Sequence, residues 1–270
     1  MRICPRYALV MLAALACLLA PAPTAKALVL DWDGVTWNPG SLNSSFDLNA
    51  DAINDITVSM TSQQANIWTN DPVTGDQTPA ITQTMTGGLS PVQNSLILAA
   101  NLKTQSNLTV HISFTGAQAG ANNVSFSIFD IDVTTNSDII DTIYGVALDG
   151  THIAATITNV GSSVNHTGTG LNQVLAGNSA TANNSSNGNA TLTFGSTIIT
   201  DIFFTFSNTS GAPRYQDIGI GDITFSPVPE INPTAVAAIC CLSGLGFVFL
   251  ARRRARQTAV LVTSELPPPR

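Results

Sequence analysis

The sequence predicts an all-β protein whose exported part is a single antiparallel β-sandwich of jelly-roll kind. Three observations support this fold class. Apolar residues recur at every second position in a series of short segments, which is the period of a half-buried strand. Clusters of Gly, Asn, Asp and Pro separate these segments, as turns do. Glu, Lys and Arg, which usually cover exposed helix faces, are nearly absent between residues 28 and 230.

The alternation is clearest between Leu108 and Phe114. Leu, Val, Ile and Phe occupy every second position there, and Thr, His and Ser lie between them. Side chains of a strand point alternately to its two faces, so this segment predicts a strand with one face in a core. The same reasoning predicts strands over 55–60, 81–85, 95–100, 123–129, 142–148, 152–158, 190–194, 198–206 and 216–225.

Two of the connections between these strands have sequences that predict their structure. Asp149-Gly150 lies between two apolar runs and predicts a tight hairpin with a type I′ turn. Residues 164–188 are poor in apolar side chains and rich in Asn, Ser, Gly and Thr, which predicts a long loop.

The apolar pattern changes phase near Asp130 and again near Asp222. Phe126 and Ile128 share one phase while Phe129 follows the other, so this strand is either buried on both faces or bulged. A similar change occurs just before Asp222. Two acidic strand ends could supply the oxygen ligands that Ca²⁺ prefers.

The sequence therefore raises the hypothesis of a calcium site, the one cofactor it suggests. The alternative is that the same aspartates cap turns by accepting hydrogen bonds from backbone N–H groups. The candidate ligands are Asp130, Asp132, Asp138, Asp141 and Asp222.

Tryptophans near the start of the exported part have two interpretations. Trp32 and Trp37 could stack on a sugar, because carbohydrate-binding sandwiches use exposed aromatic rings. Otherwise they belong to the core.

The N-terminus predicts export. Residues 1–27 hold Arg2 and Arg6, then an apolar run, then Ala25-Lys-Ala27, which together form a secretory signal peptide with its cleavage site.

The C-terminus predicts a membrane span. Residues 235–251 carry no charge, and as a helix they would be about 26 Å long, close to the thickness of a bilayer core. A basic stop follows, as on the cytoplasmic side of a span. It consists of Arg252, Arg253, Arg254 and Arg256.

The C-terminal arrangement of a Pro-Glu motif, a short apolar helix and an arginine cluster resembles the PEP-CTERM sorting signal of bacterial envelope proteins. The motif itself comprises Pro227, Val228, Pro229 and Glu230. The resemblance implies recognition by an exosortase-like membrane enzyme that cleaves near the motif and passes the exported domain to the surface or into extracellular polymer. This chain has Ile231 where the family has a second proline.

Charge and cysteine content exclude several functions. Residues 28–230 contain sixteen acids and two bases, a net charge of −14, so binding of nucleic acid phosphates is excluded. All four cysteines lie outside this range, which rules out thiol catalysis and Cys-ligated zinc. No Gly-x-Ser-x-Gly elbow or other catalytic constellation is present.

We therefore expect a non-enzymatic surface or extracellular-matrix protein, either anchored in the membrane or released by processing. The alternative is a carbohydrate-binding, lectin-like sandwich that uses calcium and contacts extracellular polysaccharide. The expected parts are a signal peptide (1–27), the sandwich (28–226), the sorting motif and linker (227–234), a transmembrane helix (235–251) and a basic cytoplasmic tail (252–270).

Overall fold

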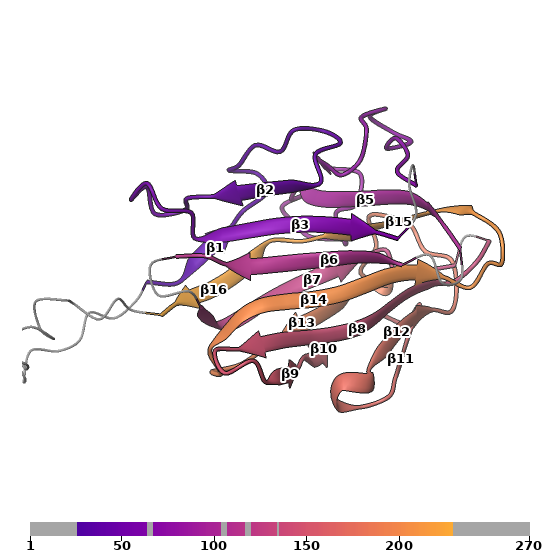
Figure 1. Cartoon of the computed structure of the whole chain (residues 1–270). Coiled ribbons are helices and arrows are strands. Elements are labelled where there is room, and N and C mark those ends of the chain that lie inside the picture. The colour runs from indigo at the N-terminus through magenta and orange to yellow at the C-terminus, as the bar shows by residue number, and fades with distance from the viewer. Residues whose placement is uncertain (1–25, 64–66, 104–106, 117–119, 134, 229–270) are drawn as a thin grey trace, which may run out of the picture. The chain divides into compact units, whose positions relative to one another are not determined.

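Two layers of antiparallel strands face each other across an apolar core (Figure 1). A computed structural model describes residues 26–63, 67–103, 107–116, 120–133 and 135–228. All strand pairs among these residues are antiparallel, and no α-helix occurs among them. The all-β class and the antiparallel pairing are confirmed.

The front layer contains five main strands in the order β2, β3, β6, β14, β8. Short strand β9 and the hairpin β11–β12 extend it beyond β8. The bounds are β2 (Asn43–Phe46), β3 (Ile56–Ser62), β6 (Leu108–Phe114), β8 (Asp138–Ala147), β9 (His152–Ala154), β11 (Val164–Thr167), β12 (Val174–Gly177) and β14 (Ile199–Asn208).

The back layer runs in the order β4, β5, β15, β7, β13, β10. Strand β16 continues β15 after a two-residue break, pairs with the first half of β7, and is flanked by β1. The bounds are β1 (Leu28–Leu30), β4 (Ala80–Thr82), β5 (Ser95–Leu102), β7 (Ala121–Phe129), β10 (Thr156–Thr158), β13 (Ala190–Thr193), β15 (Arg214–Ile220) and β16 (Ile223–Pro227).

The layers join where two inner strands begin, because Ile199 of β14 pairs with Ala121 of β7, so hydrogen bonding runs through one curled sheet. Successive long strands alternate between the layers, from β5 to β6 to β7 to β8. This alternation places strands that follow one another in sequence on opposite sides of the core.

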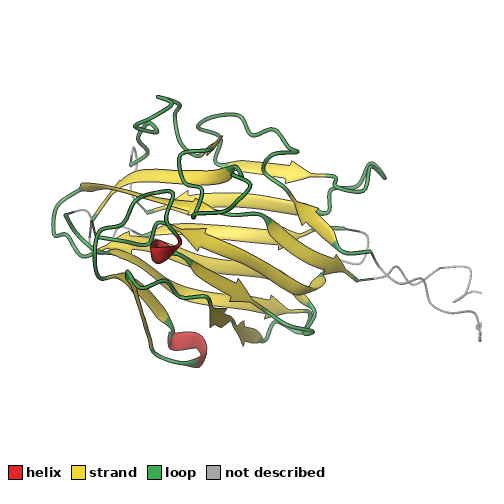
Figure 2. Cartoon of the chain, turned by 180° about the vertical axis from the view of Figure 1, so that it is seen from behind, coloured by secondary structure: helices red, strands yellow, loops and turns green. Residues whose placement is uncertain are grey.

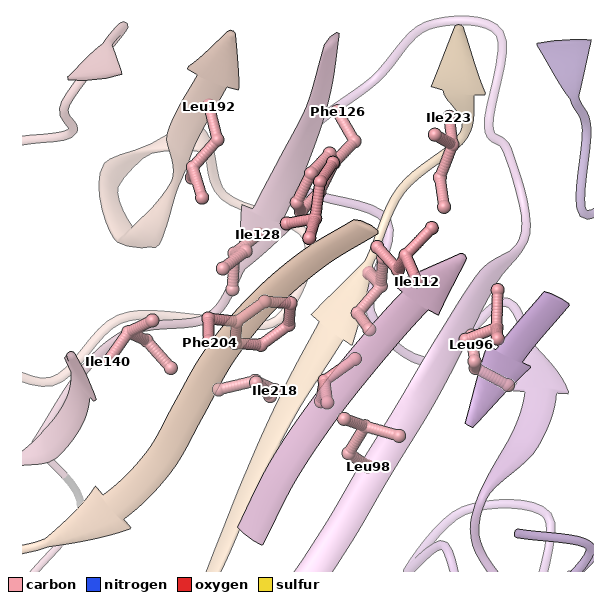
Figure 3. Packing of buried hydrophobic residues seen from close by; sticks show 14 of the residues in the cluster. Leu96, Leu98, Ile112, Phe126, Ile128, Ile140, Leu192, Phe204, Ile218 and Ile223 are labelled. Carbon is pink, nitrogen blue, oxygen red and sulfur yellow. The ribbon is translucent and has the colours of Figure 1, made fainter. Parts of the chain in front are cut away.

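The core lies between the layers and is almost entirely aliphatic and aromatic. Figure 3 shows Phe204 and Ile112 of the front layer against Ile218 and Ile128 of the back layer. These four side chains are fully or almost fully buried. Their burial follows from the period-two pattern, which turns each second residue inward.

Three predicted elements differ from the observed ones. The expected strand 216–225 is two strands, β15 and β16, separated by Gly221 and Asp222. The expected strand 152–158 breaks at Ala155, and its halves β9 and β10 join different layers. The expected loop 164–188 begins with the hairpin β11–β12, which pairs with β8 through Leu175 and Ala176. A two-strand hairpin with few apolar residues gains its stability from this docking, which sequence alone does not reveal.

The tight hairpin at Asp149-Gly150 is present, but its turn is not type I′. Only Gly150 has a positive φ, of 82°, and its N–H donates to the carbonyl oxygen of Ala147 over 2.8 Å. A type I′ turn would need positive φ at both central residues.

Several expectations fall outside the described residues. These are residues 1–25 of the signal peptide, the sorting residues Pro229 and Glu230, the apolar segment 235–251 and the basic tail. Within the described residues, no helix is long and apolar enough to cross a membrane.

Docking of the β11–β12 hairpin can be tested at Gly177. A Cβ at this position would collide with the backbone oxygen of Asp132. We expect Gly177→Ala to lower the free energy of unfolding by about 1–3 kcal/mol, because overpacking forces the backbone to shift. Urea denaturation of the full-length chain measures this change.

Gly211→Ala is the matched control. A Cβ at Gly211 meets nothing within 4 Å, so its unfolding free energy should change by less than about 0.5 kcal/mol. Equal effects of the two substitutions would mean that the hairpin does not pack as described.

Candidate functional site

A groove of about 410 Å³ crosses the outer face of the back layer. Its floor is formed by outward-facing side chains of three strands, Ser125 and Ser127 of β7, Thr191 of β13 and Thr224 of β16. Their neighbours in sequence point into the core, as the full burial of Leu192 illustrates. We call this feature the outer groove.

Two loops far apart in sequence form one wall of the outer groove. The side-chain amide of Asn189 donates to the carbonyl oxygen of Gly87 over 2.8 Å, and Thr86 N–H donates to Asn183 over 3.1 Å. A Cβ at Gly88 would lie only 3.0 Å from the backbone nitrogen of Ser186. The close approach of the loops therefore requires glycine there. Figure 2 shows loops and the short helix η2 (Ser186–Gly188) over this face.

The floor offers uncharged hydrogen-bonding groups. Ser127 and Thr191 hydroxyls lie 2.9 Å apart, and the Asn159 amide donates to Thr191 over 3.3 Å. A hydroxyl donates once and accepts twice, so these groups keep capacity for a ligand. Oδ1 of Asn189, in the wall, is buried without a hydrogen-bond partner in the described residues.

One end of the outer groove is acidic. Oδ1 of Asp222 accepts the backbone N–H of Trp32 over 3.0 Å. Burial raises the pKa of Asp222, and the nearby charges of Asp31 and Asp33 add to that effect. Asp222 thus fixes the N-terminal segment while its side chain lines the groove.

Sugar stacking by the tryptophans is a wrong prediction. Trp32 and Trp37 are only 1% and 4% exposed, so neither ring face is open to a ligand. Their rings meet edge-on at 6.3 Å, and Trp37 stacks on Phe46. The Trp32 ring donates to the carbonyl oxygen of Gly221 over 3.0 Å, which holds it in the core.

The structure gathers three of the five predicted calcium ligands. Asp130 and Asp132 follow β7, and the backbone N–H of Asp132 donates to Asp138 of β8 over 3.3 Å. Asp217 of β15 is close enough to influence the pKa of both Asp130 and Asp138. We call these four aspartates the acid cluster.

The two remaining predicted ligands lie elsewhere. Asp141 bonds the hydroxyls of Thr142 and Thr205, and Asp222 lies at the outer groove. Among the described residues no three His, Cys, Asp or Glu side chains form a group that could hold a metal ion. The five aspartates therefore do not form one calcium site.

The strand before the acid cluster is buried on both faces, which was one of the two expected alternatives. Ile128 and Phe129 are both buried, as is Ile131. The backbone then turns at Asp130, whose φ is 62°.

The acid cluster is uncompensated. Burial raises the pKa of Asp130 to about 8 and that of Asp217 to about 6, and it raises the pKa of Asp138 well above its usual value. Oδ1 of Asp130 and Oδ1 of Asp138 have no hydrogen-bond partner. A buried carboxylate without a partner is costly when charged, so protons are expected here at neutral pH.

A second oxygen-rich segment, residues 47–55, was missed by the sequence analysis. Ala52 N–H donates to Asp47 over 2.8 Å, and Ile53 N–H donates to Asp51 over 2.8 Å. Leu48 N–H donates to Asp55 over 2.7 Å. The signal was the spacing Asp-x-Asn-x-Asp, in which oxygen ligands of calcium loops recur. The hydrogen bonds described account for the shape of the segment without an ion.

The expected absence of catalysis stays a prediction. His166 forms a 3.0 Å hydrogen bond with the Gln173 side chain. His111 and His152 lie on strands of the front layer. His111 contacts Asp201 through Nε2, and no hydrogen bond from a serine hydroxyl to the ring of His111 or His166 is seen in the described residues.

Comparisons with known proteins identify no family. No family model matches the sequence, and no curated protein matches it. Among solved structures, a family 11 carbohydrate-binding module from Clostridium thermocellum, in complex with a β-1,3-1,4-mixed-linked tetrasaccharide, is 11% identical with a TM-score of 0.32, over 76% of this chain and 97% of that chain.

Two further structures give similar values. The family 11 module of the Clostridium thermocellum cellulase Lic26A-Cel5E is 10% identical with a TM-score of 0.31, over 77% of this chain and 98% of that chain. The mannan-recognising module TmCBM27 is 11% identical with a TM-score of 0.28, over 50% and 75%. Scores this low carry no argument, so the function is argued from the site alone.

The acid cluster predicts that stability falls as pH rises. Unfolded aspartate ionises near 3.8, whereas folded Asp130 ionises near 8, so the folded state binds more protons between these values. The contribution of Asp130 to the free energy of unfolding is fully present below pH 3.8 and is lost as pH rises towards 8. We expect the melting temperature of the full-length chain to fall across this window.

Asp138→Asn should flatten this dependence and raise the melting temperature at pH 8, because it removes a buried charge. The exposed Asp76→Asn removes one charge at the surface and should leave the profile unchanged. A wild-type profile that is flat or rises with pH would contradict the assignment.

The same melts at pH 7.5 test the calcium prediction. Bound Ca²⁺ would raise the midpoint in millimolar calcium relative to EDTA, since a ligand of the native state stabilises it. Loss of that shift in Asp138→Asn would place the ion at the acid cluster, and loss in Asp51→Asn would place it in segment 47–55. An unchanged wild-type midpoint would remove calcium from both.

Proposed function

We propose that the described domain is a non-catalytic carbohydrate-binding module of an exported surface protein, with the outer groove as its binding site. The observation that carries the proposal is the chemistry of the groove, whose floor presents uncharged hydroxyl and amide groups beside one carboxylate. Sugars are recognised by such groups, because each hydroxyl of a sugar both donates and accepts.

Charge narrows the class of ligand. The described residues contain fifteen Asp and only Lys26, Lys103 and Arg214 as bases, so the domain repels polyanions. The groove has a volume of about 410 Å³ and is lined by strand residues of the back layer, so we expect it to take a segment of a longer chain. A neutral polysaccharide satisfies both conditions.

Isothermal titration of the full-length chain against β-glucan, mannan and xylan, with alginate as the anionic control, tests binding. We expect Thr224→Trp to weaken binding at the groove at least tenfold, about 1.4 kcal/mol, because the exposed Thr224 side chain lines the groove and an indole would fill it.

Thr167→Trp is the matched control, because Thr167 is an exposed threonine on β11, away from the groove. Equal affinity of Thr224→Trp and wild type would exclude the groove, and absence of binding to every neutral polysaccharide would refute the function. Release of reducing ends from the bound polysaccharide would show that the protein is an enzyme instead.

We also propose that export and sorting follow the sequence signals at the two ends. Removal of residues 234–270 should move the protein from the membrane fraction into the medium, because the apolar segment and its basic stop would be gone. Fractionation and the mass of the mature C-terminus measure this. A truncated protein that stays in the membrane fraction would refute the anchor, and a mature chain that retains Arg270 would refute cleavage.

A further inference from the structure

Four aromatic side chains from four strands stack in a row on the front layer. His111 of β6 stacks on Phe203 of β14 at 4.3 Å, with ring planes 4° apart. Phe203 is followed by Tyr144 of β8 at 5.3 Å, and Tyr144 by His152 of β9 at 4.2 Å. We call this row the aromatic ladder. It crosses three inter-strand steps of about 4.8 Å each, so it spans about 14 Å.

The aromatic ladder lies on the outer face of its layer. Phe203 is half-buried, while Ile202 and Phe204 on either side of it are fully buried in the core. The side chain of His111 is 33% exposed, and His152 is exposed. Within the part of the chain that the structure describes, no loop crosses this layer in Figure 1, in contrast to the back layer in Figure 2.

Polar groups flank the aromatic ladder. Asp201 lies 2.7 Å from Nε2 of His111 and faces Ser113 across the strand pair. Ser59 and Thr57 of β3 continue the same face. His152 is exposed, and His111, Tyr144 and Phe203 are half-buried, so each ring keeps some accessible surface. Aromatic rings beside hydrogen-bonding groups are the chemistry that recognises the apolar and hydroxyl-bearing faces of a sugar.

Other classes of ligand fit this face less well. An added peptide strand would need unpaired backbone groups, but β6, β14 and β8 are paired on both sides. A polyanion would be repelled by the acidic domain. An uncharged saccharide chain meets neither obstacle.

We propose that the aromatic ladder is a second polysaccharide-contacting site, on the layer opposite the outer groove, so that one domain bridges two saccharide chains. This inference rests on the proposed function, because it takes the same class of ligand. Since the core separates the two faces, one short segment of polysaccharide cannot cover both, and bridging is the consequence.

The experiment measures stoichiometry and cross-linking for the full-length chain with the same neutral polysaccharides. Titration gives the number of sites, and turbidity reports bridging between chains. We expect two sites in the wild type. His152→Ala and Phe203→Ser should each weaken the ladder site at least tenfold and abolish turbidity, while the groove site stays. Val73→Ala is the control, because Val73 is 74% exposed in the loop before β4 and belongs to neither the ladder nor the groove.

The outcomes separate this inference from the proposed function. If His152→Ala and Phe203→Ser leave stoichiometry and turbidity unchanged while Thr224→Trp abolishes binding, the ladder is structural and the inference falls, although the function stands. If the wild type binds no neutral polysaccharide, both the proposed function and this inference are refuted. Because His152 is exposed, its substitution tests the inference even if Phe203→Ser does not fold.

Discussion

Apolar packing between the two layers is the constraint on which the rest of this structure depends. The described residues contain no cysteine and only three Lys or Arg side chains, so disulfides and ion-pair networks contribute nothing to holding the layers together. Among the described residues, the one contact between a basic and an acidic side chain, His111 with Asp201, lies on an outer face. Stability must therefore come from burial of side chains such as Phe204 and Ile218, at about 25 cal/mol for each Å² removed from water.

This dependence leaves the outer faces free for binding. When every inward position of a strand is committed to the core, the outward positions of β7, β13 and β14 carry Ser, Thr and an occasional aromatic ring without loss of packing. Loops then decide what each face becomes. Over the back layer the contact of Asn189 with Gly87 turns a flat face into a groove, whereas the front layer keeps its row of rings.

Period-two alternation is local information, and for that reason it predicted strand β6 at its observed bounds and the all-β class. It could not predict the hairpin β11–β12, whose few apolar residues gain their partner from β8. Burial of Trp32, one of the two expected interpretations, depends on tertiary contacts, because its ring donates to the carbonyl oxygen of Gly221 and meets Trp37 edge-on.

The two candidate sites could not be predicted from the sequence, for another reason. Gly87 and Asn189 are neighbours only because two loops cross one face, and His111, Tyr144, His152 and Phe203 align only in the final strand register. A partial signal did exist, since these aromatic residues occupy the polar phase of their strands. The acid cluster was found in part, because Asp130, Asp132 and Asp138 are close in sequence, while Asp217 comes from the other end of the chain.

The net negative charge of the domain affects both the acid cluster and the two outer faces. Fifteen aspartates against three bases keep polyanions away from both the groove and the ladder, but the same excess forbids neutralising a buried carboxylate with a lysine or arginine. Where β7 ends near β8 and β15, the chain therefore buries Asp130 and Asp138 in their protonated forms at neutral pH. The scarcity of basic residues thus makes the stability of the domain depend on pH.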